Sequence, residues 1–74
     1  MEKIRISLAA ARVNAGMTQD EVAARIHVGK QTIVSWEKGK TVPKINQAYS
    51  LSELYHMPID CIFLPSKLAN SEKN

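Results

Sequence analysis

The stretch from Thr18 to Gly39 constrains the fold of this chain most strongly, because it carries two apolar patterns with very little chain between them. Thr18 and Glu21 form a Thr-x-x-Glu capping box, which is typical of the first turn of a helix. Three apolar residues then recur at helical spacing: Val22, Ala23 and Ile26. These features predict a helix that begins after Thr18 and buries one face.

A second apolar pattern follows almost at once. It consists of Val28, Ile33 and Trp36, and Gly39 is placed to end the helix. Between the two patterns, the turn is expected to consist of His27, Val28 and Gly29. Two helices that cross steeply over so short a turn form a helix-turn-helix.

The outward face of the second helix indicates what this motif binds. If Ile33 and Trp36 face inward, a mixed set of side chains must face outward: Lys30, Gln31, Val34, Ser35 and Lys38. In the major groove of DNA, amides pair with adenine, lysines with guanine, and a valine can contact a thymine methyl group. An ordinary solvated helix face is the alternative interpretation, but on the second helix of this motif, in a basic chain, base reading is favoured.

The composition of the chain limits the classes of function that it can have. The chain has 74 residues, enough for one small domain, and a formal net charge of +3 that is compatible with nucleic acid. Its single cysteine, Cys61, precludes an intrachain disulfide, and the two histidines lie far from it. We therefore expect no metal site, no cofactor and no enzymatic activity. Without a signal peptide or a membrane span, a cytoplasmic location is expected.

The rest of the chain also reads as helical. Apolar residues at helical spacing predict a first helix from Ile4 to Ala15 and a fourth from Ile45 to Tyr55. A short, strongly apolar fifth helix is expected between Pro58 and Pro65. Residues 1–65 would then form the domain, and residues 66–74 a polar tail expected to be disordered.

Two charged residues far apart in the sequence are expected to meet. Glu37 lies near the end of its helix, where the helix dipole disfavours a carboxylate, and it would repel a DNA phosphate. Arg12 lies one residue from the apolar stripe of the first helix. A structural ion pair between Arg12 and Glu37 would neutralise the carboxylate at the helix end and hold it away from DNA. The alternative is that the two residues are unrelated surface charges.

A basic corner follows the third helix. Lys38, Lys40 and Lys44 surround a turn at Gly39. Such a corner beside the major groove can hold a phosphate strand. A loop that merely keeps the surface soluble is the alternative.

Three segments of the chain together resemble a known family. The stretch T-Q-D-E-V-A-A-R-I, the helix K-Q-T-I-V-S-W-E-K-G and the following P-K-I resemble the Cro/C1-type (Xre) helix-turn-helix domains of phage repressors and bacterial regulators. The resemblance extends from about Ile4 to Phe63. It implies an all-α fold: a compact five-helix bundle of the lambda-repressor-like type, with helices 2 and 3 forming the helix-turn-helix. Such domains usually bind palindromic operators as dimers.

The resemblance also assigns roles to individual positions. Base edges would be contacted by Lys30, Gln31, Thr32 and Ser35. Phosphates would be contacted by Gln19, Lys38, Lys40 and Thr41. The dimer interface would include Ile62, Phe63 and Leu64. The Arg12–Glu37 pair matches a buried ion pair of some phage repressors.

The chain departs from the family pattern at three positions. His27 and His56 stand where the family commonly has a glycine with positive φ, so both are interpreted as helix C-caps and not as pH sensors. Gly29 stands where a serine or threonine N-cap is common. Glycine is an acceptable cap, but a hydroxyl that would contact a phosphate is missing, which predicts modest affinity.

The leading hypothesis is a sequence-specific transcriptional regulator, expected to be a repressor that binds its DNA operator as a dimer. A second hypothesis is an antitoxin or other module that binds a protein partner through the apolar segment from Ile59 to Leu64. A third is that the chain is the DNA-binding part of a longer regulator, with a linker that begins after Pro65.

Overall fold

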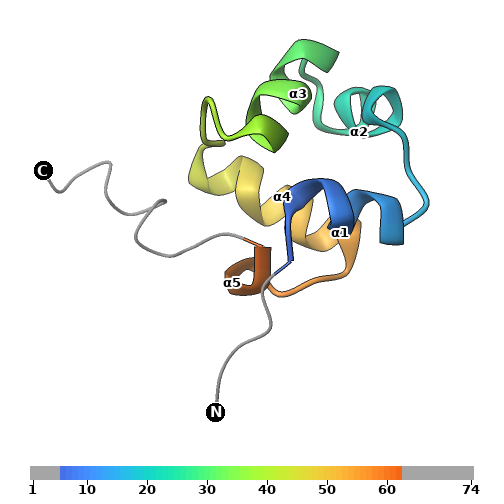
Figure 1. The fold of residues 1–74 in the computed structure, drawn as a ribbon, viewed down its shortest axis with the longest axis vertical. Helices are drawn as coiled ribbons and strands as arrows, with labels where there is room; N and C mark the ends of the chain where they lie inside the picture. Colours follow the sequence, from blue (N-terminus) through green and yellow to red (C-terminus); the bar gives the residue numbers. More distant parts are fainter. Residues whose placement is uncertain (1–5, 63–74) are drawn as a thin grey trace, which may run out of the picture.

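The computed structural model describes residues 6–62, and within this range the chain forms helices joined by turns (Figure 1). The five helices are α1 (Leu8–Asn14), α2 (Gln19–Ile26), α3 (Lys30–Lys38), α4 (Ile45–Tyr55) and α5 (Ile59–Ile62). The all-α, five-helix fold predicted from the sequence is confirmed, and α2 and α3 form the helix-turn-helix.

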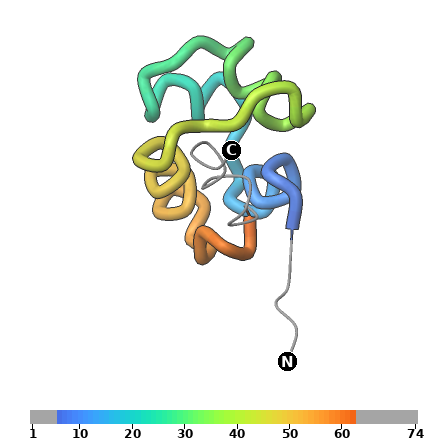
Figure 2. The backbone as a smooth tube through the Cα atoms, turned by 90° about the vertical axis from the view of Figure 1, so that its left-hand side faces the viewer, coloured from blue at the N-terminus to red at the C-terminus, as the bar shows by residue number. Residues whose placement is uncertain are grey.

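A small core lies where the first four helices meet. Helix α3 packs against α2 and α1, and α4 packs against α1, α2 and α5. Figure 2 shows α2 and α3 at one end of the domain, α1 and α4 in the middle and α5 at the opposite end. The buried residues of the hydrophobic core are Ala11, Val22, Ala23, Ile33, Trp36, Ala48, Leu51 and Tyr55. This arrangement places the outward face of α3 at one end of the molecule.

The helix-turn-helix is held by its own local bonds. Thr18 Oγ1 accepts from the Glu21 backbone N–H at 3.1 Å, and Glu21 Oε1 accepts from the Thr18 N–H at 2.8 Å. The predicted capping box is therefore present. His27 ends α2 in the left-handed conformation, and the extended residue Gly29 precedes α3 without a side-chain cap.

The start of the first helix differs from the sequence-based prediction. That helix was expected to begin at Ile4, but it begins at Leu8 because Ser7 is extended and caps it. The Ser7 hydroxyl accepts a hydrogen bond from the Ala10 N–H at 3.0 Å. Serine competes in this way for backbone donors and favours helix starts. Ile4 itself lies outside the described residues.

Helix α5 connects the two ends of the described chain. The Cys61 carbonyl accepts a hydrogen bond from the Ile6 N–H at 2.9 Å, just before α1 begins. Ile59 and Ile62 are partly buried and pack against the core. The expected continuation of this helix toward Pro65 lies outside the described residues.

Two histidines end helices in a conformation that favours glycine. His27 has φ 64° and His56 has φ 57°. A residue with a Cβ atom is strained there by roughly 1 kcal/mol. We therefore expect His27→Gly to raise the free energy of unfolding by about 0.5 to 1 kcal/mol, as measured by urea denaturation. His27→Ala is the matched control, because it removes the imidazole but keeps Cβ; equal stabilisation by both variants would contradict backbone strain as the cause.

Candidate nucleic-acid interface

Helix α3 has two sharply different faces. Ile33 and Trp36 are buried in the core. On the other side, Lys30 and Gln31 are exposed. Val34, Ser35 and Thr32 are half-buried, with Thr32 toward the flank of the exposed face. An exposed, mainly polar helix face with an amide near its start has the shape and chemistry that major-groove reading requires.

The loop after α3 is bonded back onto the helix. Gly39 adopts a positive φ of 77°, and the Lys40 N–H donates to the Ser35 carbonyl at 3.0 Å. The hydroxyls of Ser35 and Thr41 share a hydrogen bond of 2.8 Å. The structure thus brings together Ser35, which is expected to contact base edges, and Thr41, which is expected to contact a DNA phosphate. The sequence indicated the glycine turn, but gave no direct signal for the bond between these two hydroxyls.

Arg12 and Glu37, expected as an ion pair, lie in contact. Arg12 Nε donates to Glu37 Oε2 at 2.7 Å, and Nη2 lies 3.4 Å from Oε1. Arg12 Nη1 also donates to the Met17 carbonyl at 2.9 Å. The two side chains are only 16% and 9% exposed. The guanidinium therefore connects α1, the turn before α2 and the end of α3.

Glu37 has a second hydrogen-bond partner, Gln19, in addition to Arg12. Gln19 Nε2 donates to Glu37 Oε1 at 2.9 Å. Gln19 was expected to contact a phosphate, and the structure shows what orients its amide beforehand. An amide has two N–H groups, so one bond to Glu37 leaves a second donor for another acceptor. No local pattern of the sequence indicates this bond, because it depends on how the start of α2 packs against the end of α3.

Burial and charge around Glu37 also affect two ionisable groups. The hydrogen bond with Glu37 raises the pKa of Arg12, so the guanidinium stays charged. Burial, with a smaller contribution from the Glu37 charge, raises the pKa of Tyr55 to about 12. Tyr55 is 4% exposed, and its phenol therefore remains neutral beside the ion pair at physiological pH.

The remaining cations of the candidate interface are exposed. Lys38 and Lys40 are solvent-accessible at the end of α3 and in the loop after it. Lys30 Nζ lies 3.8 Å from Asp20 Oδ2, with side chains 51% and 72% exposed. Because both side chains are so exposed, this ion pair contributes little to stability. Lys30 can therefore exchange Asp20 for a base or a phosphate.

The residues expected at a dimer interface are only partly within the described chain. Ile62 is half-buried and packs against the core. Phe63 and Leu64 lie outside the described residues.

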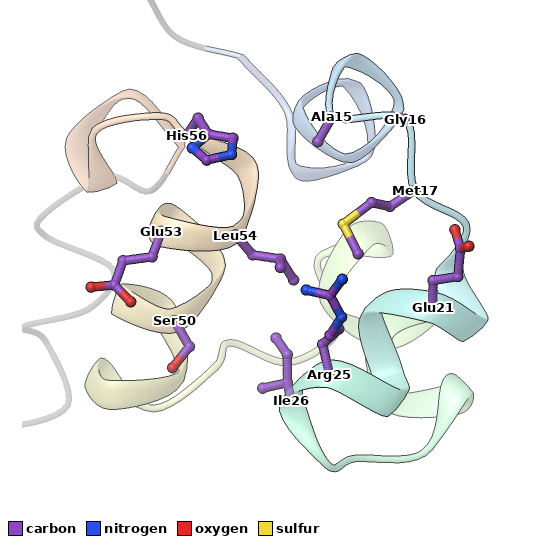
Figure 3. Close-up of a pocket in the computed structure, with 10 residues that line it drawn as sticks. All are labelled: Ala15, Gly16, Met17, Glu21, Arg25, Ile26, Ser50, Glu53, Leu54 and His56. Atoms are coloured by element: carbon purple, nitrogen blue, oxygen red, sulfur yellow. The ribbon is translucent and has the colours of Figure 1, made fainter.

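A cleft of about 670 Å³ lies away from the exposed face of α3, between α2, α4 and the turn after α1 (Figure 3). Its lining combines apolar side chains with Glu21, Arg25 and Glu53. None of the residues expected to contact DNA lines it. Within residues 6–62 no group of three or more residues is arranged to hold a metal ion, and no helix is long and apolar enough to cross a membrane.

A second helix with a core-facing side and an exposed polar side, set after a three-residue turn, defines a helix-turn-helix protein of the DNA-binding kind. The chain belongs to the Cro/C1-type helix-turn-helix family, whose profile, described as helix-turn-helix, matches residues 8–60. The matched range includes all of α1 to α4.

Relatives agree with this assignment. An uncharacterized HTH-type transcriptional regulator of Archaeoglobus fulgidus is 38% identical over 53 residues, which are 72% of this chain and 76% of the relative. A cryptic phage CTXphi transcriptional repressor, RstR, from Vibrio cholerae is 37% identical over 62 residues, which are 84% of this chain and 56% of that protein. No solved structure shows a significant match. The chain is thus a DNA-binding transcriptional regulator by family.

Proposed function

We propose that this protein is a repressor that reads a palindromic operator as a dimer, with α3 in the major groove. The observation that supports this most directly is the exposed face of α3, continued by a loop that the Ser35–Thr41 bond fixes against it. The similarity to the phage repressor RstR favours repression over activation. The protein would act in the cytoplasm, where its DNA is accessible.

In this proposal the residues fall into two groups. Base edges are contacted by Lys30, Gln31, Thr32 and Ser35, and phosphates by Gln19, Lys38, Lys40 and Thr41. Residues 1–65 form the DNA-binding domain, and residues 66–74 take no part in base reading. The dimer would form at least on DNA, and Ile62, Phe63 and Leu64 were the residues expected at its interface.

Selection of bound sites from random duplex DNA tests the proposal. A palindromic consensus with half-sites about one helical turn apart is expected, since a two-fold dimer places two α3 helices in successive major grooves. Titration of the winning duplex at two salt concentrations should then show a steep loss of affinity with salt. Recovery of no consensus, together with weak binding of every duplex, would contradict the proposal and favour a module that binds a protein partner.

The phosphate role of Lys40 gives a quantitative expectation. Lys40→Ala should weaken binding to the selected duplex and to random duplex by the same factor, because a phosphate contact carries no sequence information. The slope of log affinity against log salt should also fall by about 0.9. Arg25→Ala is the matched control, because it removes an exposed cation that faces the cleft and not the candidate interface. Equal effects of both variants would mean that only net charge matters.

A further inference from the structure

Exposed apolar side chains gather in one short segment. Within the described chain, four large hydrophobic residues are exposed, and three of them lie in the loop before α4 and in its first half. These are Val42, Ile45 and Tyr49, which are 47%, 53% and 57% exposed. Clustered apolar exposure of this kind typically marks an interaction site.

The exposed apolar residues of α4 belong to a row of outward-facing residues that also includes charged side chains. The inner face of α4 buries Ala48, Leu51 and Tyr55. Ile45, Tyr49 and Glu53 therefore follow one another at i, i+4 spacing toward the outside. Glu53 is exposed, as is Lys44 just before the helix. In residues 6–62 neither Lys44 nor Glu53 has an ion-pair partner within the chain.

Such a row is complementary to a copy of itself. If two α4 helices pack antiparallel about a two-fold axis at Tyr49, residue 45 of one copy lies opposite residue 53 of the other. The two Tyr49 side chains then meet at the axis, and Ile45 of each copy lies opposite Glu53 of the other. Lys44 of each copy comes within reach of that Glu53 carboxylate. A two-fold contact uses the same patch on both subunits and requires this kind of self-complementarity.

We propose that two copies of this chain meet at the α4 face, the surface formed by Val42 in the loop before α4, by Ile45 and Tyr49 on α4, and by the charged residues Lys44 and Glu53. The proposal rests on the dimeric DNA reader proposed above, and it names the surface through which that dimer forms. Val42 lies one residue beyond Thr41, which is bonded to α3. The interface therefore begins where the candidate DNA-binding loop ends.

The size of the patch determines when the dimer forms. Three partly exposed side chains offer a few hundred Å², whereas a stable complex buries roughly 800 Å² on each partner. The copies therefore separate in dilute solution and pair when two half-sites hold them at high effective concentration. Helix α5 lies at the opposite end of the domain from α2 and α3 (Figure 2). The α4 face is therefore distinct from the C-terminal residues that the family resemblance places at the dimer interface.

Cooperativity on DNA tests this surface. The probes are the selected duplex and the same duplex with one half-site scrambled. Tyr49→Ser should leave affinity for the single half-site unchanged and reduce cooperative binding of the full site by about tenfold, the typical effect of removing an interface aromatic residue. Val13→Ser is the matched control, because Val13 is 63% exposed on α1. A Lys44→Glu, Glu53→Lys double exchange should restore the cooperativity that Glu53→Lys alone removes. Because Lys44 also belongs to the basic corner after α3, the cooperativity of each variant is taken relative to its own affinity for the single half-site.

Unchanged cooperativity in Tyr49→Ser would overturn the proposal, and its loss in Leu64→Ser alone would assign the dimer to the C-terminal segment. Disulfide crosslinking provides a readout that does not need an operator. In a Cys61→Ser background at high protein concentration, Tyr49→Cys should crosslink at least about tenfold faster than Val13→Cys, because residue 49 meets its copy at the two-fold axis. Equal crosslinking rates for Tyr49→Cys and Val13→Cys would exclude the α4 face as the dimer surface. Because crosslinking needs no DNA, this result can be told apart from a failure to find an operator.

Discussion

Arg12→Ala is expected to lower the free energy of unfolding by about 3 kcal/mol, because it leaves Glu37 as a charge without its cation in a largely buried position. The Glu37 side chain is 9% exposed, and only the Gln19 amide would remain bonded to it. The substitution also removes the donor to the Met17 carbonyl. A domain of this size has a total stability of only several kcal/mol, so the variant should approach the unfolding threshold.

Thermal and urea denaturation of Arg12→Ala and Glu37→Gln will measure this loss. Asp20→Asn is the control, since it breaks the open pair with Lys30 and should change stability by less than about 1 kcal/mol. A loss in Arg12→Ala as small as that of the control would show that the Arg12–Glu37 pair contributes no more than a surface pair.

Gln31→Ala is expected to reduce discrimination at one base pair of the operator by about 1 to 3 kcal/mol, since a bidentate amide contact is worth that much against the wrong base. Gln31 is exposed on α3, so its truncation should leave stability nearly unchanged. Affinity for random duplex DNA should stay close to that of the unaltered protein.

Competition titrations with operators substituted one base pair at a time will locate the position that Gln31 reads. Lys40→Ala gives the contrasting pattern, because it should weaken all duplexes alike. Equal losses of Gln31→Ala on operator and on random DNA would exclude Gln31 as a base-reading residue.

Much of the fold could be predicted because local signals and burial agree. The Thr18–Glu21 capping box and the bounds of α4 follow from short-range patterns that the core does not oppose, and the left-handed conformation of His27 was expected from the resemblance to the family. Arg12 and Glu37 were predicted as a pair because Glu37 was badly placed alone and Arg12, one residue from the apolar stripe of the first helix, could reach it. A charged residue that is unfavourable in its own helix indicates that a residue of opposite charge lies nearby in the fold.

The start of the first helix was predicted wrongly, and two side-chain hydrogen bonds were not predicted. All three depend on interactions that the spacing of apolar residues does not reveal. The first helix begins at Leu8 and not at Ile4 because the Ser7 hydroxyl bonds to the backbone there, although the apolar spacing continues upstream. The bonds of Gln19 to Glu37 and of Ser35 to Thr41 join side chains whose proximity depends on how α2 and the loop fold against α3. The base and phosphate assignments themselves stay predictions until DNA binding is measured.

The position of Glu37 has a consequence for genetics. A screen for loss of repression in cells should return variants of Arg12 and Glu37 beside variants of Gln31, although neither Arg12 nor Glu37 is expected to contact the operator. The two groups should separate by abundance, because modest destabilisation exposes a protein to proteolysis and lowers its steady-state level. Variants of Gln31 should accumulate normally and fail only at the promoter, so immunoblotting would sort the screen before any DNA experiment.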